Sequence, residues 1–240
     1  SLETCCRRRR RRSPGCAANS LLKPSCSLMP LSEAAAAAVT ERFQARLATI
    51  ANRASTVSLR AWEQLGAWDR VDIDRFAAAT ADAFKAAQAA AVNTSAGYYA
   101  LLADRPVTVP AATTTAVVEA PFTAYWHALT EGAEWAEALA TGGTRAESIA
   151  SDLIVGTSRE VANLTAATGV VGWRRVLTGS SCKFCSTVAG QRYRSNESAT
   201  FGHDHCDCIV VPIYADADPG QVINARHLAQ VADGVPGIRV

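Results

Sequence analysis

The sequence predicts an α+β protein, in which a mainly helical N-terminal region is followed by a small α+β module. Alanine is frequent, whereas aromatic residues make up only 7% of the 240 residues, and this composition favours helices over β-sandwiches. Apolar residues first recur at steps of three and four, and from residue 170 onward the pattern changes to short β-like runs. The helices therefore come first and the sheet follows.

Two long helices are predicted in the first part of the chain. Ser32 is a good N-cap for the first. Its apolar face recurs at three- and four-residue steps, at Phe43, Leu47, Ile50, Ala54 and Val57. We expect Gly66 to end it. The second helix is predicted from Val71 to Leu101, and Arg105-Pro106 is its stop signal, because the residue before a proline disfavours the helical conformation.

A third helical pattern begins at Thr113, and Gly142-Gly143 is expected to end it. Thr144 and Glu147 then resemble a capping box, so a fourth helix is predicted from there to about Gly169. Three large aromatic residues in this region are expected in the core: Tyr125, Trp126 and Trp135.

From Val170 the chain alternates between short strands and turns. Strands are predicted at 170–177, at 191–194 and at 209–214. One or two helical turns are expected at 182–189, ending at Gly190, and a weak helix at 220–231. No apolar run approaches the roughly 20 residues that a membrane-spanning helix needs, so we expect no membrane partner.

Charge and cysteine are unevenly distributed along the chain. Residues 1–28 contain seven basic residues against Glu3, a net charge of +6, whereas the remaining 17 basic and 21 acidic residues give −4. The body of the protein therefore has no overall attraction for DNA. Four of the eight cysteines lie in residues 1–28, and the other four lie between 182 and 208. This grouping favours a reducing compartment and a metal-bound cluster over a disulfide scaffold.

Residues 1–28 form an Arg/Cys-rich leader that includes six consecutive arginines, Arg7 to Arg12. A basic arm for nucleic acid or a targeting signal is one interpretation. The other, which we favour, is that Met29 is the natural start and that residues 1–28 are non-native or disordered.

The most distinctive motif is Cys182-x2-Cys185 followed by His203-x-His205-Cys206-x-Cys208. Thiolate and imidazole are the ligands that Zn²⁺ prefers, and two close-spaced ligand groups joined by a loop are typical of structural zinc sites. Four ligands are needed and six are offered. We favour Cys182, Cys185 and Cys206, with the fourth taken from Cys208, His205 or His203.

Three other functions remain as alternatives at this motif. A catalytic zinc would need an open position and a general base, and neither the deaminase nor the metalloprotease spacing is present. A thiol oxidoreductase would not need the second ligand group. A nucleic-acid-binding zinc module would use flanking basic residues as phosphate contacts, namely Arg174, Arg175, Lys183, Arg192 and Arg194. We expect no catalytic residues and no enzyme activity.

The motif and its flanks resemble a known family. Trp173-Arg-Arg-Val-Leu-Thr-Gly-Ser-Ser-Cys182-Lys-Phe-Cys185, then Ala189-Gly190, then the His/Cys group and Pro212 resemble the C-terminal signature of MuF-like minor head proteins of tailed phages. The variant with two cysteines in each group is similar to those of actinobacterial phages and prophages. In the broader family an Arg/His-bearing segment replaces the first cysteine pair. The match extends over residues 170–214.

The resemblance implies a minor capsid protein that acts in head morphogenesis, in the virion near the portal and in the host cytoplasm during assembly. Its implied partners are the portal and major capsid proteins, with packaged DNA left open. No small-molecule substrate is expected. The predicted organisation is therefore a leader (1–28), a helical region (29–168) with a break near 104–112, a zinc-stabilised α+β module (169–214) and a tail (215–240).

Overall fold

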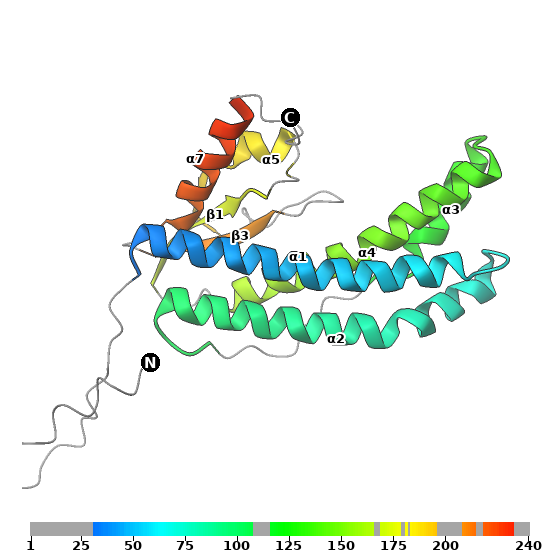
Figure 1. The fold of residues 1–240 in the computed structure, drawn as a ribbon, viewed down its shortest axis with the longest axis horizontal. Helices are drawn as coiled ribbons and strands as arrows, with labels where there is room; N and C mark the ends of the chain where they lie inside the picture. The colour runs from blue at the N-terminus through cyan, green and yellow to red at the C-terminus, as the bar shows by residue number, and fades with distance from the viewer. Residues whose placement is uncertain are drawn as a thin grey trace, which may run out of the picture.

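The structure, a computed structural model, describes residues 31–107, 116–165, 169–178, 181, 183–195, 208–214 and 218–232. The leader at 1–28 lies outside the described residues. The described chain folds as a mainly helical region followed by a small three-stranded antiparallel sheet with helices, which confirms the α+β prediction (Figure 1). None of the described helices has an apolar stretch sufficient to cross a bilayer.

The helical region is built on three long helices. Helices α1 (Glu33–Glu63) and α2 (Arg70–Ala103) lie side by side, and α4 (Trp135–Thr165) packs against both. The shorter α3 (Ala120–Thr130) packs on α4 at the end of the bundle farthest from the sheet (Figure 1). Helix α3 and the sheet thus lie at opposite ends of the molecule (Figure 1).

The first two helices begin and end close to the predicted signals. The Oγ atom of Ser32 accepts a hydrogen bond from the N–H of Ala35 at 3.3 Å, as an N-cap does. Helix α1 ends before Gly66, and α2 ends at Ala103. Its C-cap Asp104 has a left-handed φ of 50° and lies two residues before Pro106. The predicted apolar face of α1 is buried at Phe43, Leu47 and Ala54, but Val57 is exposed, contrary to the prediction.

A buried carboxylate closes the turn between α1 and α2. The Oδ2 atom of Asp72 accepts hydrogen bonds from the N–H groups of Ala67 at 2.9 Å and Trp68 at 2.7 Å, and Arg75 lies 3.1 Å from Oδ1. Burial alone would raise the pKa of Asp72, but these hydrogen bonds and the nearby guanidinium outweigh it and hold the pKa below its ordinary value. The first turn of α2 therefore contains a charged aspartate that several donors surround.

The predicted end of the third helix at Gly142-Gly143 is wrong, because α4 runs continuously through both glycines. The predicted capping box at Thr144 is wrong for the same reason. The glycines instead let α4 approach Trp62 of α1: a Cβ at Gly142 would lie 2.3 Å from Cζ2 of that ring. The two glycines thus serve packing between helices and not helix termination.

The third helix is shorter than predicted. Residues 116–119 are not helical, and α3 begins at Ala120 with Pro121 in its first turn. Of the three aromatic residues expected in the core, Tyr125 is buried. Trp126 and Trp135 are about half exposed, at 49% and 57%, so the prediction is wrong for both.

The sheet has the strand order β2-β1-β3, with all pairs antiparallel. Strand β1 (Val170–Val176) is central, β2 (Arg192–Tyr193) is a short edge strand, and β3 (Ile209–Tyr214) is the other edge. Helix α5 (Lys183–Val188) connects β1 to β2, and α7 (Pro219–Ala232) packs against β1 and α1. All five elements lie close to their predicted positions.

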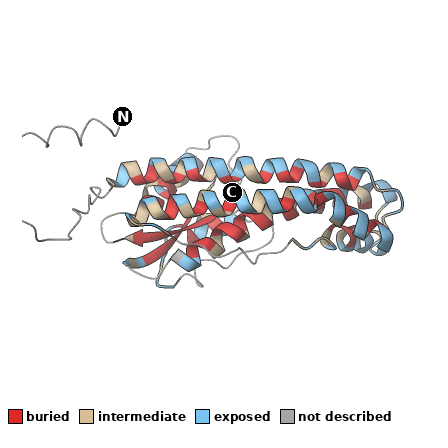
Figure 2. Cartoon of the chain, turned by 90° about the horizontal axis from the view of Figure 1, so that it is seen from below, coloured by how far each residue is buried: buried red, intermediate tan, exposed pale blue. Residues whose placement is uncertain are grey.

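One hydrophobic core joins the sheet to the near half of the bundle. It contains Phe43 of α1, Tyr99 of α2 and Trp173 of β1, together with residues of α4, β3 and α7. The hydroxyl of Tyr99 donates to the carbonyl of Val210 at 3.0 Å, and burial raises the pKa of Tyr99. A second core around Trp62 fills the far half of the bundle. Figure 2 shows buried residues along the inner helix faces and over most of the sheet.

The close approach at Gly142 is testable. Gly142→Ala should lower the free energy of unfolding by at least about 2 kcal/mol, because its new methyl group overlaps a packed indole ring. That ring cannot move freely, since its Nε1 atom donates to the carbonyl of Leu139 at 3.2 Å. The measurement is urea denaturation followed by circular dichroism.

The matched control is Gly97→Ala in α2, where an added Cβ has nothing within 4 Å. This change should be neutral or stabilising by up to about 1 kcal/mol, because alanine is the better helix former. Equal stability of the two variants would contradict the packing role of Gly142.

Candidate metal centre

Two of the predicted metal ligands, Cys185 and Cys208, are brought together in the structure. Both are 1% exposed, and both belong to a small buried cluster with Leu177 and Ala189. Cys185 lies within α5, and Cys208 immediately precedes β3. The antiparallel register explains the convergence: Val176 pairs with Ile209, so the end of β1 lies beside the start of β3.

The other four candidate ligands lie outside the described residues: Cys182, His203, His205 and Cys206. Within the part of the chain that the structure describes, no group of three or more His, Cys, Asp or Glu side chains gathers as a metal site. The described residues therefore establish the positions of one cysteine from each half of the motif.

The turn after β1 contributes a hydroxyl to this cluster. The N–H of Ser181 donates to the carbonyl of Thr178 at 3.1 Å, and the N–H of Thr178 donates to Oγ of Ser181 at 2.8 Å. This reciprocal pair holds the Ser181 hydroxyl 3.2 Å from the sulfur of Cys208. The backbone carbonyl of Cys208 also accepts a hydrogen bond from Arg159 of α4 at 2.9 Å. Cys208 is thus positioned by both the sheet region and the bundle.

A buried guanidinium lies beside the other cysteine. Arg175 of β1 is fully buried, and its Nη1 atom lies 3.6 Å from the sulfur of Cys185. A positive charge next to sulfur stabilises the thiolate, which is the form that binds metals. An N–H donor to a metal-bound sulfur is also a common partner that orients the ligand. The side chains around Cys185 therefore fit a site in which thiolates bind a metal.

Asn224 of α7 connects three parts of the module. Its Nδ2 atom donates to the carbonyls of Arg175 and Ala189, both at 2.8 Å, and its Oδ1 atom accepts from the N–H of Leu177 at 2.9 Å. The side chain is 3% exposed, and it uses both amide hydrogens and its oxygen. It thereby ties the end of β1 and the end of α5, on either side of Cys185, to α7.

The neighbouring Arg174 is buried and bound inward. It forms a bidentate ion pair with Asp218, with Nη2 at 2.7 Å from Oδ2 and Nε at 2.9 Å from both carboxylate oxygens. Its Nη1 atom donates to the carbonyl of Gly190 at 2.9 Å. Arg174 and Arg175 are therefore buried and not available as the phosphate contacts that the nucleic-acid-binding alternative would need. Lys183, Arg192 and Arg194 are exposed.

The family model described as VG15 protein matches residues 27–228, which include both the helical bundle and the cysteine module. The chain belongs to the VG15 protein family. No curated protein and no solved structure matches it.

Sequence reasoning missed three residues that organise the centre of this VG15 protein: Arg175, Ser181 and Asn224. The sequence places Arg175 only among possible phosphate contacts, and residue type does not indicate its burial, because an arginine is rarely fully buried. Asn224 lies in a helix whose sequence pattern is weak, so nothing marked it as a core residue. The only available signal was that two consecutive arginines occupy a strand otherwise made of apolar residues.

The role of Asn224 predicts a strong effect of an isosteric change. Asn224→Asp should lower the free energy of unfolding by about 3 kcal/mol or more, because the carbonyls of Arg175 and Ala189 lose their donors and face a buried carboxylate. Hydrogen exchange should report faster opening of β1 and α5. Gln221→Glu, on the exposed face of the same helix, is the matched control. A large effect of the control, or none of Asn224→Asp, would contradict this role.

Proposed function

We propose that this VG15 protein is a structural minor capsid protein of a phage or prophage head, of the MuF-like type, with a structural zinc site. The observation that supports it most is the convergence of Cys185 and Cys208, one from each half of the sequence motif, in one buried cluster. Other signature residues meet in the same module: Arg174 donates to Gly190, and Trp173 lies in the core beneath.

The zinc would be held by four thiolate or imidazole ligands. The shared buried cluster of Cys185 and Cys208 supports both as ligands, and the remaining two would come from Cys182, Cys206, His205 and His203. The position of Cys208 supports it as the fourth ligand beside the three cysteines that the sequence favours. When bound, the metal supplies cross-links between the turn region after β1 and the segment before β3. Such a small sheet gains folding stability from a structural metal.

Burial of the described cysteines supports a structural role over a redox one. A reactive thiol is typically partly exposed, whereas Cys185 and Cys208 are each 1% exposed. A DNA-binding role for the module is less well supported, because the two central arginines of the suggested phosphate-binding set are bound inside the protein. The proposed partners are accordingly the portal and major capsid proteins, with assembly in the host cytoplasm and residence in the virion.

Metal analysis tests the zinc site. Elemental analysis of the purified chain should find about one zinc ion per chain. Replacement by Co²⁺ should give the absorption of sulfur-to-cobalt charge transfer. Cys185→Ser and Cys208→Ser should each reduce zinc content and melting temperature, because each removes a ligand from a closed site.

The matched control for zinc binding is Cys16→Ser in the leader, which should change neither quantity. A chain without zinc, or one in which Cys185→Ser and Cys208→Ser leave both zinc content and melting temperature unchanged, would show that the proposed site is wrong.

Particle analysis tests the head protein. In a host that carries the gene within a phage or prophage, quantitative mass spectrometry of purified particles should find this protein at far fewer copies than the major capsid protein. Deletion of the gene should reduce the yield of infectious particles, and a plasmid copy should restore it. Complete absence from particles, together with a normal yield after deletion, would rule out the proposed role.

A further inference from the structure

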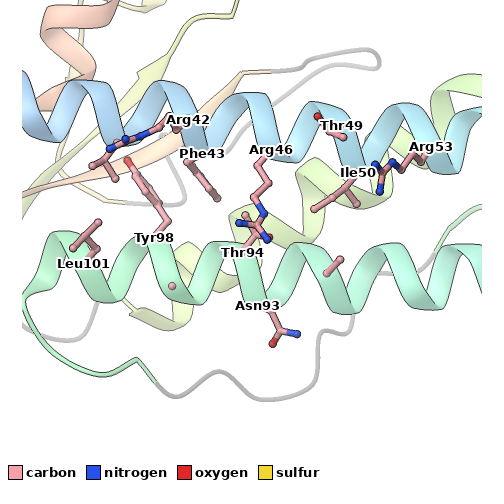
Figure 3. A pocket seen from close by; sticks show the side chains of 13 residues that line it. Arg42, Phe43, Arg46, Thr49, Ile50, Arg53, Asn93, Thr94, Tyr98 and Leu101 are labelled. Carbon is pink, nitrogen blue, oxygen red and sulfur yellow. The ribbon is translucent and has the colours of Figure 1, made fainter. Parts of the chain in front are cut away.

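A groove of about 890 Å³ runs between α1 and α2 on a face to which α4 contributes no lining residue. Figure 3 shows its two walls, with Arg46 extended from α1 toward Thr94 of α2. The groove lies in the half of these helices nearest the sheet (Figure 1). It is separate from the cysteine cluster and from the basic residues around it.

The charged residues that line the groove are all arginines. Arg42, Arg46 and Arg53 lie on α1 at steps of four and seven residues, which is about 6 Å and about 10 Å along the helix axis. All three are exposed, and no aspartate or glutamate is among the lining residues. Among the described residues none of the three forms an ion pair. This is a local positive row on a body whose net charge from residue 29 is negative.

The floor of the groove is apolar and closely packed. The rings of Phe43 and Tyr98 stack with centroids 4.0 Å apart and an interplanar angle of 5°, and both side chains are buried. Ile50 is half-buried, and Leu101 is 44% exposed at one end. On the α2 side Gly97 leaves the groove open, since a Cβ there would have nothing within 4 Å.

These features favour one kind of occupant. Single-stranded nucleic acid would need exposed aromatic rings for base stacking, but Phe43 and Tyr98 are buried against each other. The chain's own leader is positively charged and would be repelled by the arginines. A helix with an apolar stripe would cover Ile50 and Leu101, and carboxylates beside that stripe would meet the arginines. This is the helix-in-groove mode of recognition.

We propose that the groove between α1 and α2 binds an acidic amphipathic helix of a partner protein, with Arg42, Arg46 and Arg53 pairing with its carboxylates. The partner helix would lie along the α1–α2 pair as an added helix of the bundle. The apolar floor supplies contact area. The arginine row selects a partner helix that carries carboxylates, and it fixes the orientation of that helix along the groove. The proposal is independent of the zinc site and of the capsid role.

The test uses the full chain and a fluorescent helical peptide of about three heptads. The peptide has leucine at positions a and d of each heptad and glutamate at the flanking positions e and g. Fluorescence anisotropy should detect binding that weakens with salt. The triple variant R42E/R46E/R53E should weaken it by at least about tenfold. Gly97→Gln should also weaken it, because its side chain enters the groove while all three arginines remain.

The matched control is Arg60→Glu, an exposed arginine of α1 outside the groove, which should leave affinity unchanged within about twofold. Circular dichroism melting verifies that each variant is folded. If a variant does not fold, Arg46→Gln takes its place, because it removes one positive charge without adding a negative one. Arg46→Gln should also weaken binding of the peptide.

Four outcomes would overturn the proposal. The first is no binding of the glutamate peptide. The second is equal binding of the same peptide with lysine in place of glutamate. The third is binding of single-stranded or duplex oligonucleotides, lost in the triple variant, without binding of the glutamate peptide. The last is a dimer in sedimentation that the triple variant converts to a monomer, which would identify a second copy as the occupant.

Discussion

Two consecutive buried arginines on the central strand impose the main constraint on the C-terminal half of this protein. A buried charge is costly unless partners surround it, so the elements around β1 must supply them. Asp218 at the start of α7 and the carbonyl of Gly190 bind Arg174, and the sulfur of Cys185 lies against Arg175. Gly220 reflects the same crowding, because a Cβ there would lie 2.9 Å from Cδ of Arg174. The positions of α5 and α7, and hence of Cys185, follow from this requirement.

Features set by local patterns were predictable from the sequence, and features set by distant partners were not. The caps and stop signals of α1 and α2 act within a few residues, and strands β1 and β3 contain runs of valine or isoleucine, so these elements are predictable from local sequence. Gly142 was misread because the reason for it, the Trp62 ring, is remote in sequence. The cysteine motif predicts a shared site, and two of its six candidate ligands, Cys185 and Cys208, lie in one buried cluster. The amide of Asn224 and the burial of Arg175 depend on tertiary packing, which residue type alone does not reveal.

The sheet and the bundle are joined by hydrogen bonds as well as by their shared core. Gln44 of α1 donates to the carbonyl of Leu177 at 3.0 Å, Arg226 of α7 pairs with Glu41 of α1, and Arg159 of α4 donates to Cys208. Because the core around Tyr99 contains residues of both parts, disruption of the sheet would reach the near half of the bundle. The far half packs around Trp62 in a separate cluster and would be affected less. The expected unit of local unfolding is therefore the sheet with the adjoining helix ends.

The arginine groove belongs to this same unit. Its floor includes Tyr98, whose hydroxyl is 2.8 Å from that of Thr40 on α1. The next residue, Tyr99, donates a hydrogen bond to the carbonyl of Val210 on β3, two residues after Cys208. The spacing of α1 and α2 at the groove therefore depends on the core that β3 completes. Phe43 and Tyr98 of the groove floor belong to the same core cluster as Ile209, Val210 and Val211 of β3. Loosening of β3 would therefore remove the hydrogen-bond acceptor of Tyr99 and part of the core that surrounds Tyr98 and Phe43.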